Sequence, residues 1–358
     1  MKRFPFLDWM RGLAVVIMIQ CHVFNSFTRL DLRDGGPYIL SQFVGGMAAP
    51  LFLFMAGMTL AFQMESLYRR EPDPRRRWWA AMRRAGYILA IAFAFRLTNW
   101  MGSYPNGSAQ EIFKVDILNC MGVAMAAFSV AAMVRPAARA QFAVGLALAI
   151  AAASPLMTNI SWTGAPDLLH QYLVPVTGRG QFAFFPCAAY VGFGLALGTV
   201  VKRTAEERFD RLVQWTVLLA FGMIFAAQYF ANIPFSVYPK SNFWTDSPSL
   251  ILIRVGVAML MLAAAYLWTQ YGAQASWSWM QTLGKTSLMV YWVHVVMVYG
   301  ALGRPLKRTM NIPQAALATL IVIGMMVALS AGKLWWKARR AQTPIGAATV
   351  RERSSVLT

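Results

Sequence analysis

Residues 7–25 read LDWMRGLAVVIMIQCHVFN, an apolar stretch that contains one acid, one guanidinium and one imidazole. Arg11 and His22 are eleven residues apart, and a helix that turns by ~100° per residue returns them to within ~20° of the same face. With a rise of ~1.5 Å per residue they are roughly 16 Å apart along the helix. Asp8 lies three residues before Arg11, a spacing that allows an ion pair at the helix start. One face of this helix is therefore predicted to carry all three groups.

These polar groups lie in a predicted membrane segment, where they indicate function. An Arg or Asp at the centre of such a segment costs on the order of 2.5–3.5 kcal/mol. An alternative interpretation is that Asp8 and Arg11 simply mark the cytoplasmic end of the helix, where a carboxylate also suits the helix dipole. His22 lies deeper in the apolar sequence, so this alternative explains it less well.

The composition is that of a membrane protein. Of the 358 residues, 58% are hydrophobic and 13% are charged. Apolar runs of about twenty residues recur, which predicts an all-α polytopic membrane protein with about ten transmembrane helices. The spans are predicted at residues 9–28, 39–63, 84–101, 113–134, 141–154, 182–201, 212–230, 249–269, 283–299 and 313–333. We expect residues 1–340 to form a single domain and residues 341–358 to form a short, disordered cytoplasmic tail.

The distribution of positive charge predicts the orientation. The formal net charge is +19. With the N-terminus inside, the cytoplasmic segments hold about 23 of the 33 Lys and Arg and the outer segments about 8. This asymmetry predicts that both termini lie in the cytoplasm, and it explains the charge without nucleic acid as a partner. One loop disagrees, because the last outer loop carries Arg304, Lys307 and Arg308. Either this loop is functional or the ninth and tenth spans are misplaced.

The cysteines and the familiar site motifs favour neither redox nor metal chemistry. Cys21, Cys120 and Cys187 all lie in predicted spans, so we expect apolar side chains rather than a disulfide framework. The sequence contains no H-E-x-x-H, C-x-x-C, Walker or G-x-G-x-x-G pattern. A metal site and a nucleotide-binding fold are therefore not predicted.

Several polar groups are predicted toward the outer half of the membrane, where they could converge. A histidine oriented by a carboxylate is the minimal general base, and a nearby arginine can hold a substrate or a developing oxyanion. The alternative is a set of satisfied hydrogen bonds between helices, because polar groups in lipid need partners in any case. The predicted set consists of His22, Asn25, Arg96, Asp116, Asn119, Arg254 and His294.

A second polar cluster is predicted toward the cytoplasm. It contains Asp8, Arg11, Lys285 and the basic segment before the third span, which includes Arg83 and Arg84. Arg and Lys pair with phosphates by charge-assisted hydrogen bonds, so the cluster suits a phosphorylated cytoplasmic ligand. Topological anchoring explains most of the arginines in the basic segment equally well. Two polar clusters connected along the first span suggest a reaction across the membrane.

The opening stretch resembles a known motif. LDWMRGLAVVIMIQCH is similar to the first motif of the transmembrane acyltransferase superfamily, whose core is an arginine, ten residues and a histidine. The superfamily includes the acyltransferase-3 proteins and the bacterial relatives of heparan-α-glucosaminide N-acetyltransferase. Later segments resemble the family in the same order, and the set is most similar to the heparan-acetyltransferase-like branch. They are AAPLFLFMAGMTLAF (48–62), VDILNCMGVAM (115–125), FFPCAAYVGFGLALG (184–198) and LGKTSLMVYWVH (283–294).

The resemblance implies a multi-pass enzyme of the bacterial inner membrane. Such an enzyme moves an acyl group, most simply acetyl, from cytoplasmic acyl-coenzyme A to a hydroxyl or amine of an extracytoplasmic carbohydrate or glycan. The resemblance implies that His22 is the catalytic base or a transient acyl carrier, Arg11 its basic partner and Asp116 the acid of the fourth span. His294 and Lys285 occupy positions similar to another segment of the family.

The contacts to the coenzyme are the least defined part of the resemblance. The family's Arg-x-x-Arg pattern in the inner loop is replaced here by denser arginine runs. The candidates for the acyl-coenzyme A site are Arg11, Lys285, Arg83 and Arg84. Acyl-coenzyme A, as a co-substrate, is the only cofactor expected, without a metal.

Two other functions remain compatible with the sequence. The first is a transporter or flippase for a glycan or lipid intermediate, because intramembrane His, Asp and Arg also form proton relays and substrate paths. The second is a non-catalytic sensor or scaffold, for which substitution of His22 should be harmless. Thioester consumption separates an enzyme from a carrier. The lipid bilayer is the expected partner in every case, and a homodimer is an open alternative.

Overall fold

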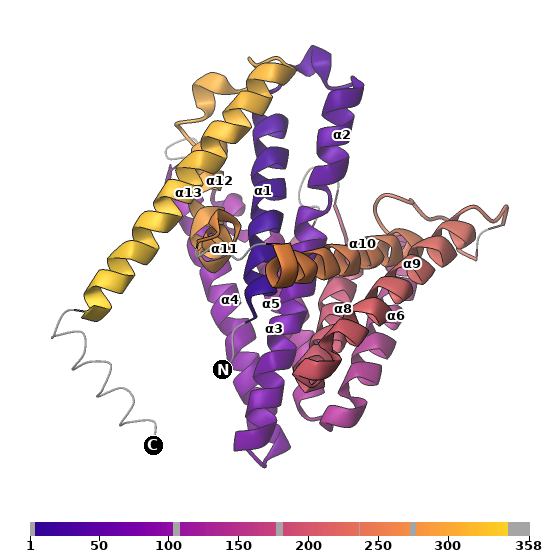
Figure 1. The fold of residues 1–358 in the computed structure, drawn as a ribbon. Coiled ribbons are helices and arrows are strands. Elements are labelled where there is room, and N and C mark those ends of the chain that lie inside the picture. The colour runs from indigo at the N-terminus through magenta and orange to yellow at the C-terminus, as the bar shows by residue number, and fades with distance from the viewer. Residues whose placement is uncertain (1–3, 103–107, 177–181, 236, 273–276, 343–358) are drawn as a thin grey trace. The chain divides into compact units, whose positions relative to one another are not determined.

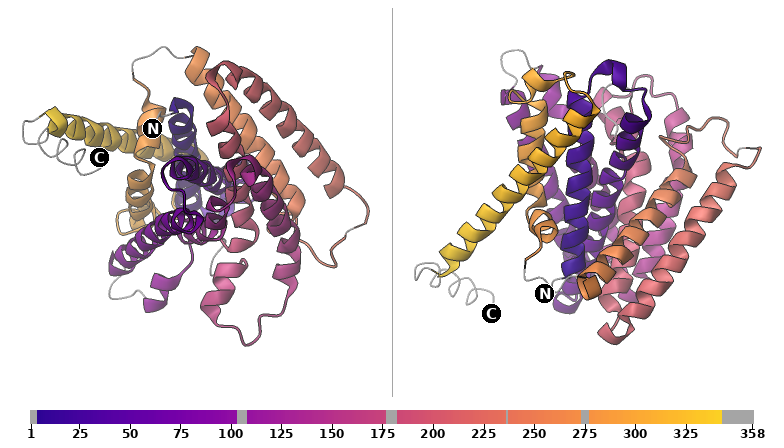
Figure 2. Two further views of the ribbon diagram at one scale, coloured as in Figure 1. Left: turned by 90° about the horizontal axis from the view of Figure 1, so that it is seen from below. Right: turned by 45° about the horizontal axis from the view of Figure 1, so that its top comes forward.

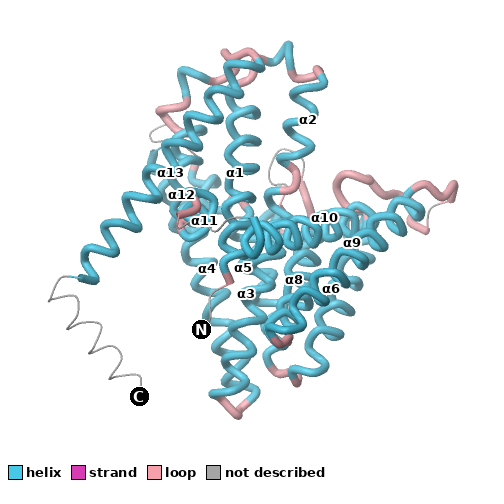
Figure 3. The backbone as a smooth tube through the Cα atoms, in the orientation of Figure 1, coloured by secondary structure: helices cyan, strands magenta, loops and turns pink. Residues whose placement is uncertain are grey.

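Helices form the fold throughout the part of the chain that the structure describes. This computed structural model describes residues 4–102, 108–176, 182–235, 237–272 and 277–342. Thr28 and Met310 form a parallel bridge, and Figure 3 shows helices joined by loops. The fold class predicted from the sequence, an all-α polytopic membrane protein, is confirmed.

Eight of the described helical segments are long and apolar enough to cross a membrane. Two of the ten predicted spans are not among them. Residues 84–101 lie in α4 (Pro74–Gly102), whose first turns are rich in arginine, and residues 283–299 do not form a single helix. The number of ten spans and the cytoplasmic location of both termini stay predictions. The eight segments are Pro5–Phe27, Gly36–Arg70, Ala109–Ala132, Pro136–Asn159, Phe184–Arg203, Glu206–Ala231, Pro248–Gly272 and Ile312–Arg340.

The predicted ninth span is divided at Thr286, which corrects the prediction of one helix over 283–299. Helix α11 (Trp279–Lys285) ends there and α12 (Ser287–Tyr299) begins one residue later. The buried Thr286 hydroxyl lies 3.0 Å from the carbonyl oxygen of Thr282 and 2.7 Å from Oγ of Ser330. A threonine side chain that bonds to nearby backbone carbonyls competes with the regular helix.

The chain also departs from the predicted bounds at two other places. The span predicted at 39–63 is divided, because α2 (Gly36–Gly45) ends before α3 (Ala48–Arg70) begins. Helix α13 (Ile312–Gln342) extends two residues into the predicted tail. The remainder of that tail, residues 343–358, lies outside the described residues.

The helices belong to two compact units, and each is described by itself. Unit 1 contains residues 1–45 and 269–358, and unit 2 contains residues 46–268. Both boundaries fall where helical structure changes, between α2 and α3 and within the π-helical turn Trp268–Gly272. The expectation of a single domain over residues 1–340 stays a prediction.

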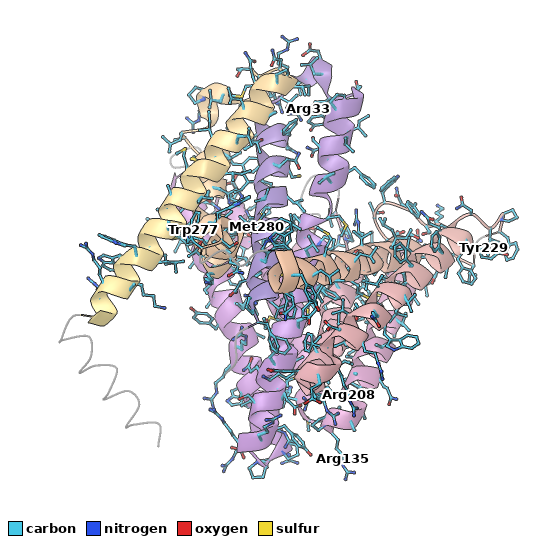
Figure 4. The ribbon with its side chains drawn as sticks, in the orientation of Figure 1. Arg33, Arg135, Arg208, Tyr229, Trp277 and Met280 are labelled. Carbon is cyan, nitrogen blue, oxygen red and sulfur yellow. The ribbon has the colours of Figure 1, made fainter. Side chains whose placement is uncertain are left out.

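Helix α1 (Pro5–Phe27) is the central helix of unit 1, and α2, α11, α12 and α13 all contact it (Figure 1). Pro5 occupies the first helical turn, where its missing N–H costs nothing. Two glycines bring α1 and α11 into backbone contact. A Cβ atom on Gly12 would collide with the carbonyl oxygen of Met280, which Figure 4 labels beside α1, and one on Gly284 would collide with that of Asp8.

Unit 2 is built around α8 (Phe184–Arg203), which is buried along most of its length. Helices α3, α5, α6, α7 and α10 contact α8, while α4 packs on α5 and α9 packs along α10 (Figure 2). A Cβ atom on Gly194 of α8 would collide with the carbonyl oxygen of Phe54 in α3, so these two helices also meet backbone to backbone. The other helices are α5 (Ile117–Phe128), α6 (Pro136–Asn159), α7 (Asp167–Leu173), α9 (Phe209–Ala231) and α10 (Pro248–Leu267).

Candidate active site

Two histidines that are distant in sequence meet in unit 1. Nδ1 of His22 in α1 lies 3.0 Å from Nε2 of His294 in α12, with the ring centroids 5.2 Å apart and the planes inclined by 12°. His294 is fully buried, whereas His22 keeps part of its surface exposed. Tyr299, at the end of α12, lies edge-on to His22 with the centroids 5.3 Å apart. The structure therefore brings together two of the residues predicted for the outer site.

The hydrogen bonds of this pair determine which ring nitrogens carry protons. Nδ1 of His294 lies 2.6 Å from the carbonyl oxygen of Val290. A carbonyl oxygen only accepts, so the proton of a neutral His294 must be on Nδ1 and its Nε2 must accept. Nδ1 of His22 is then the donor in the contact between the rings. A neutral His22 consequently has no proton on Nε2, and the lone pair of that nitrogen is available as a base or nucleophile.

A further contact holds the two helices in register. The Ser26 hydroxyl in α1 donates to the carbonyl oxygen of Val298 in α12 over 3.2 Å, and both residues are buried. Ser26 follows His22 by one helical turn, and Val298 follows His294 by one turn. A second contact between α1 and α12, one turn further along both helices, therefore supports the imidazole pair.

The predicted cytoplasmic cluster is partly assembled in unit 1. Arg11 donates to Asp8 over 3.1 Å, and the side chain of Asp8 is only 4% exposed. The backbone of Gly284 lies against the carbonyl oxygen of Asp8, which places the next residue, the exposed Lys285, at this end of α1. Arg11 and His22 share α1 as predicted. The second prediction, that Arg11 partners His22 or a coenzyme, stays a prediction.

Asp116 in unit 2 forms the N-cap of α5. Its Oδ1 accepts from the backbone N–H groups of Leu118 and Asn119 over 2.9 and 3.2 Å, and the Asn119 side chain accepts from Asp116 N–H in return. Oδ2 faces Nε of Arg96 at 3.2 Å. Oδ1 therefore accepts two hydrogen bonds, whereas Oδ2 has the ion pair with Arg96 but no hydrogen bond within the described residues. The predicted catalytic role of Asp116 stays a prediction.

The amide of Asn119 connects the same region to a short helix. Its Nδ2 donates to the hydroxyl of Tyr172 in α7 over 3.1 Å. Burial raises the pKa of Tyr172 above its ordinary value, so the phenol stays protonated at neutral pH. Tyr172 was not among the residues predicted from the sequence. Tyr172 lies between two predicted spans in a helix of seven residues, which is too short to give a periodic signal.

The remaining predicted residues are placed separately. Arg254 is half-buried in α10 and interacts electrostatically with Tyr190 and Cys187 of α8. Asn25 is exposed one turn beyond His22. His22 and His294 belong to unit 1, whereas Arg96, Asp116, Asn119 and Arg254 belong to unit 2. Convergence of all seven residues on one site stays a prediction.

The basic segment of α4 contains arginines of two kinds. Arg83 and Arg84 are exposed, and Arg83 lines a groove of about 1020 Å³ together with Trp78 and Trp79. Arg77 is 5% exposed and donates to the carbonyl oxygen of Ala132 over 3.1 Å. Arg83 and Arg84 are therefore accessible to a ligand, whereas Arg77 is a structural residue that the sequence did not distinguish from them.

A second buried arginine was also missed. Arg139 of α6 is fully buried and donates to the carbonyl oxygens of Ala131 and Val134 over 3.1 and 3.2 Å. Its Nη1 lies 3.5 Å from Glu65 of α3. Arg139 follows the helix-start sequence Arg135-Pro136, where the positive-inside rule alone explains a basic residue.

The apolar helices and the imidazole pair define a multi-pass membrane protein with a candidate site for acyl transfer. Residues 4–331 match the family model Acyl_transf_3, described as an acyltransferase domain. The chain therefore belongs to the acyltransferase-3 family and is a membrane acyltransferase. No curated protein matches it significantly.

Proposed function

We propose that the protein transfers an acyl group, most simply acetyl, from cytoplasmic acyl-coenzyme A to a hydroxyl or amine of an extracytoplasmic carbohydrate. The observation that carries this proposal is the free Nε2 of His22, which the hydrogen bond to His294 and the bond from His294 to Val290 together leave unprotonated. A bacterial inner membrane is the proposed location, in keeping with the resemblance to the heparan-acetyltransferase-like branch.

In direct transfer His22 acts as a general base. Its Nε2 removes the proton of the acceptor hydroxyl while the oxygen attacks the thioester carbonyl. The coenzyme thiolate leaves and takes the proton back from His22. In the imidazolium intermediate, Nδ1–H of His22 still donates to Nε2 of His294. This acceptor is already in position to stabilise the positive charge that develops on His22.

A two-step route uses the same nitrogen as a nucleophile. Nε2 attacks the thioester carbonyl and forms an acyl-imidazolium that keeps its Nδ1 proton, and the coenzyme leaves as its thiolate. The acceptor hydroxyl then attacks the acyl group, its proton passes to the thiolate, and neutral His22 is restored. Both routes require Nε2 to be free, and both lose their base or nucleophile when His22 is removed.

The donor is proposed to enter from the opposite end of α1. Arg11 and Lys285 lie at that end, and cationic side chains bind phosphates by charge-assisted hydrogen bonds. The roughly 16 Å between Arg11 and His22 along the helix is within the reach of a pantetheine arm. Arg83 and Arg84, exposed in unit 2, are further candidates for contacts with the coenzyme phosphates.

The test is label transfer by purified protein in nanodiscs. Radiolabelled acetyl-coenzyme A is supplied with a cell-envelope glycan extract, and coenzyme release and labelled glycan are both measured. We expect both with the wild type and neither with His22→Ala. His170→Ala is the matched control, because His170 lies in α7 and stacks on Trp162. Equal coenzyme release by His22→Ala, or none by the wild type with any of several acyl chains, would contradict the proposal and favour a transporter.

A further inference from the structure

The loop between α12 and α13 carries charge on the side where the positive-inside rule does not expect it. Residues 300–311 contain Arg304, Lys307 and Arg308 and no acidic residue. Cations in a short outer loop work against the predicted orientation of the neighbouring helices. Retaining three of them therefore calls for either a different topology or a function.

The structure of unit 1 places this loop at the C-terminal end of α1. The backbone N–H of Arg308 donates to the carbonyl oxygen of Ser26 over 3.1 Å, and that of Met310 to Phe27 over 2.9 Å. The N–H of Arg29 donates back to Met310 over 3.0 Å. The loop is thus on the same side as the end of α1, opposite the N-terminus. In the predicted orientation this end of unit 1 faces outward, so the charge of the loop calls for a function.

The neighbouring cations at this end of unit 1 already have partners. Arg29 forms an ion pair with Asp31. Arg33, labelled near the end of α1 in Figure 4, donates to the carbonyl oxygen of Asn25 over 2.6 Å and lies over the ring of Tyr38. These two side chains therefore stabilise the loop that follows α1.

The three cations of the 300–311 loop differ from them. Arg304, Lys307 and Arg308 are exposed, and their side chains make no hydrogen bond or ion pair within the described parts of the chain. Arg308 also has a φ of 58°, a left-handed conformation that glycine and asparagine adopt more readily. Its backbone bond to Ser26 holds that conformation in place. The backbone conformation at position 308 therefore gives no reason for an arginine there.

This loop lies next to the candidate catalytic imidazole. Tyr299, which is edge-on to His22, is the last residue of α12, and the loop begins with the next residue. Along α1, Thr28 follows His22 by six residues, or about 9 Å of helix rise. Thr28 in turn pairs with Met310 of the loop. The three unpaired cations therefore lie just beyond His22, on the side from which an outer acceptor must come.

We propose that Arg304, Lys307 and Arg308 bind carboxylate or phosphate groups of the acceptor, so that the acceptor is an acidic carbohydrate. This inference rests on the proposed acyl transfer to a carbohydrate. Guanidinium and ammonium groups that lack internal partners bind such anions by charge-assisted hydrogen bonds. A cationic loop next to the site also raises the local concentration of an anionic acceptor.

The test compares binding of two defined probes to the full-length protein in nanodiscs of neutral lipid. The probes are an oligogalacturonate, with one carboxylate per sugar, and a neutral maltooligosaccharide of the same length. We expect the wild type to bind the acidic probe at least about tenfold more tightly, and the difference to shrink as salt rises from about 50 to about 500 mM. Equal binding of the two probes, or binding that is insensitive to salt, would overturn the inference.

The variant Arg304→Gln/Lys307→Gln/Arg308→Asn is expected to lose the preference for the acidic probe. Asparagine is used at 308 because it tolerates a positive φ. The matched control is Lys114→Gln/Lys240→Gln, which removes two exposed cations of unit 2, one near the start of the segment Ala109–Ala132 and one between α9 and α10, and should keep the preference. If the triple variant does not fold, Lys307→Gln alone, which changes one exposed side chain of the loop, should still weaken binding of the acidic probe.

Two further readouts separate the remaining outcomes. If anionic lipid in the nanodisc displaces the acidic probe from the wild type, and the triple variant removes that effect, the loop binds lipid headgroups and the inference is overturned. Coenzyme release by the wild type is measured in parallel. Release without a preference for the acidic probe rejects the inference alone, whereas absence of release rejects the proposed acyl transfer.

Discussion

Nδ1 of His22 in α1 lies 3.0 Å from Nε2 of His294 in α12, and the second nitrogen of His294 lies 2.6 Å from the carbonyl oxygen of Val290. The carbonyl can only accept, so the direction of both hydrogen bonds follows. His294 acts on His22 as a positioning residue: it selects the tautomer and holds the ring. As a result, Nε2 of His22 carries no proton.

Substitution of His294 tests this positioning role. His294→Leu removes the acceptor for Nδ1 of His22, and we expect kcat for coenzyme release to fall by about 10²-fold, within the range of general-base contributions. His294→Gln offers a carbonyl oxygen near the position of Nε2 and should restore part of the rate. The KM for acetyl-coenzyme A should change little in either variant. Equal rates for His294→Leu and the wild type would show that the pair is only structural.

The close approach of α1 and α11 should be sensitive to a single methyl group. A Cβ at Gly12 would meet the backbone carbonyl of Met280, which cannot rotate away as a side chain can. We expect Gly12→Ala to destabilise the protein by about 1–3 kcal/mol, as overpacking does. Gly332→Ala in α13 is the control, because open space surrounds that position, and it should be neutral or slightly stabilising. Thermal unfolding in detergent measures both variants.

The Arg96 and Asp116 side chains should be energetically coupled. Asp116→Asn keeps a good N-cap but leaves a guanidinium that is 16% exposed facing a neutral amide. We expect each of Arg96→Gln and Asp116→Asn to lower the unfolding free energy, and the double variant to lose less than the sum of the two. Additive losses in the double-mutant cycle would show that the 3.2 Å ion pair contributes no coupling energy.

Asp116→Asn also tests the catalytic role predicted from the sequence. A role confined to capping α5 and pairing with Arg96 leaves kcat per folded molecule unchanged, whereas a catalytic acid loses it. Because Oδ1 caps α5 and Oδ2 forms an ion pair with Arg96, we expect kcat to be retained. Coenzyme release corrected for the folded fraction distinguishes the two results.

Arg135, the N-cap of α6, and Arg139, one turn into the helix, should behave differently. Arg139→Gln breaks bonds to two carbonyl oxygens and leaves the buried Glu65 with only the exposed Arg69, at 3.6 Å, as an ion-pair partner. Removing one member of a buried pair typically costs about 3–5 kcal/mol. Arg135→Gln, on an exposed side chain labelled in Figure 4, should change stability by less than about 0.5 kcal/mol. Similar unfolding temperatures for the two variants would contradict the structural role of Arg139.

The first helix could be predicted from the sequence because apolar length and the spacing of Arg11 and His22 are local properties. From the sequence, His22 and His294 could only be predicted to lie at a similar depth in the membrane, and their direct contact could not be predicted. The break at Thr286 was not accessible, because it depends on contacts of Thr286 with Thr282 and Ser330, and Ser330 is distant in sequence.

In the candidate site too, local features could be predicted from the sequence and contacts between distant elements could not. The sequence pattern Asp116-x-x-Asn119 is close to a helix capping box, a local signal that could have indicated the structural role of Asp116. The buried Arg77 and Arg139 could not have been separated from exposed arginines, because the sequence places them in segments where topology already explains positive charge. Their burial depends on carbonyl groups contributed by other elements.

The central claim, that His294 leaves Nε2 of His22 unprotonated, is tested most directly by nitrogen NMR. The protein carries ¹⁵N-labelled histidine in lipid bilayers at a pH of about 8, where a histidine of ordinary pKa is neutral. His170→Ala removes the only other histidine. We expect both remaining rings to carry their proton on Nδ1, with Nε2 bare and a coupling between Nδ1 of His22 and Nε2 of His294. A proton on Nε2 of His22 would contradict the claim.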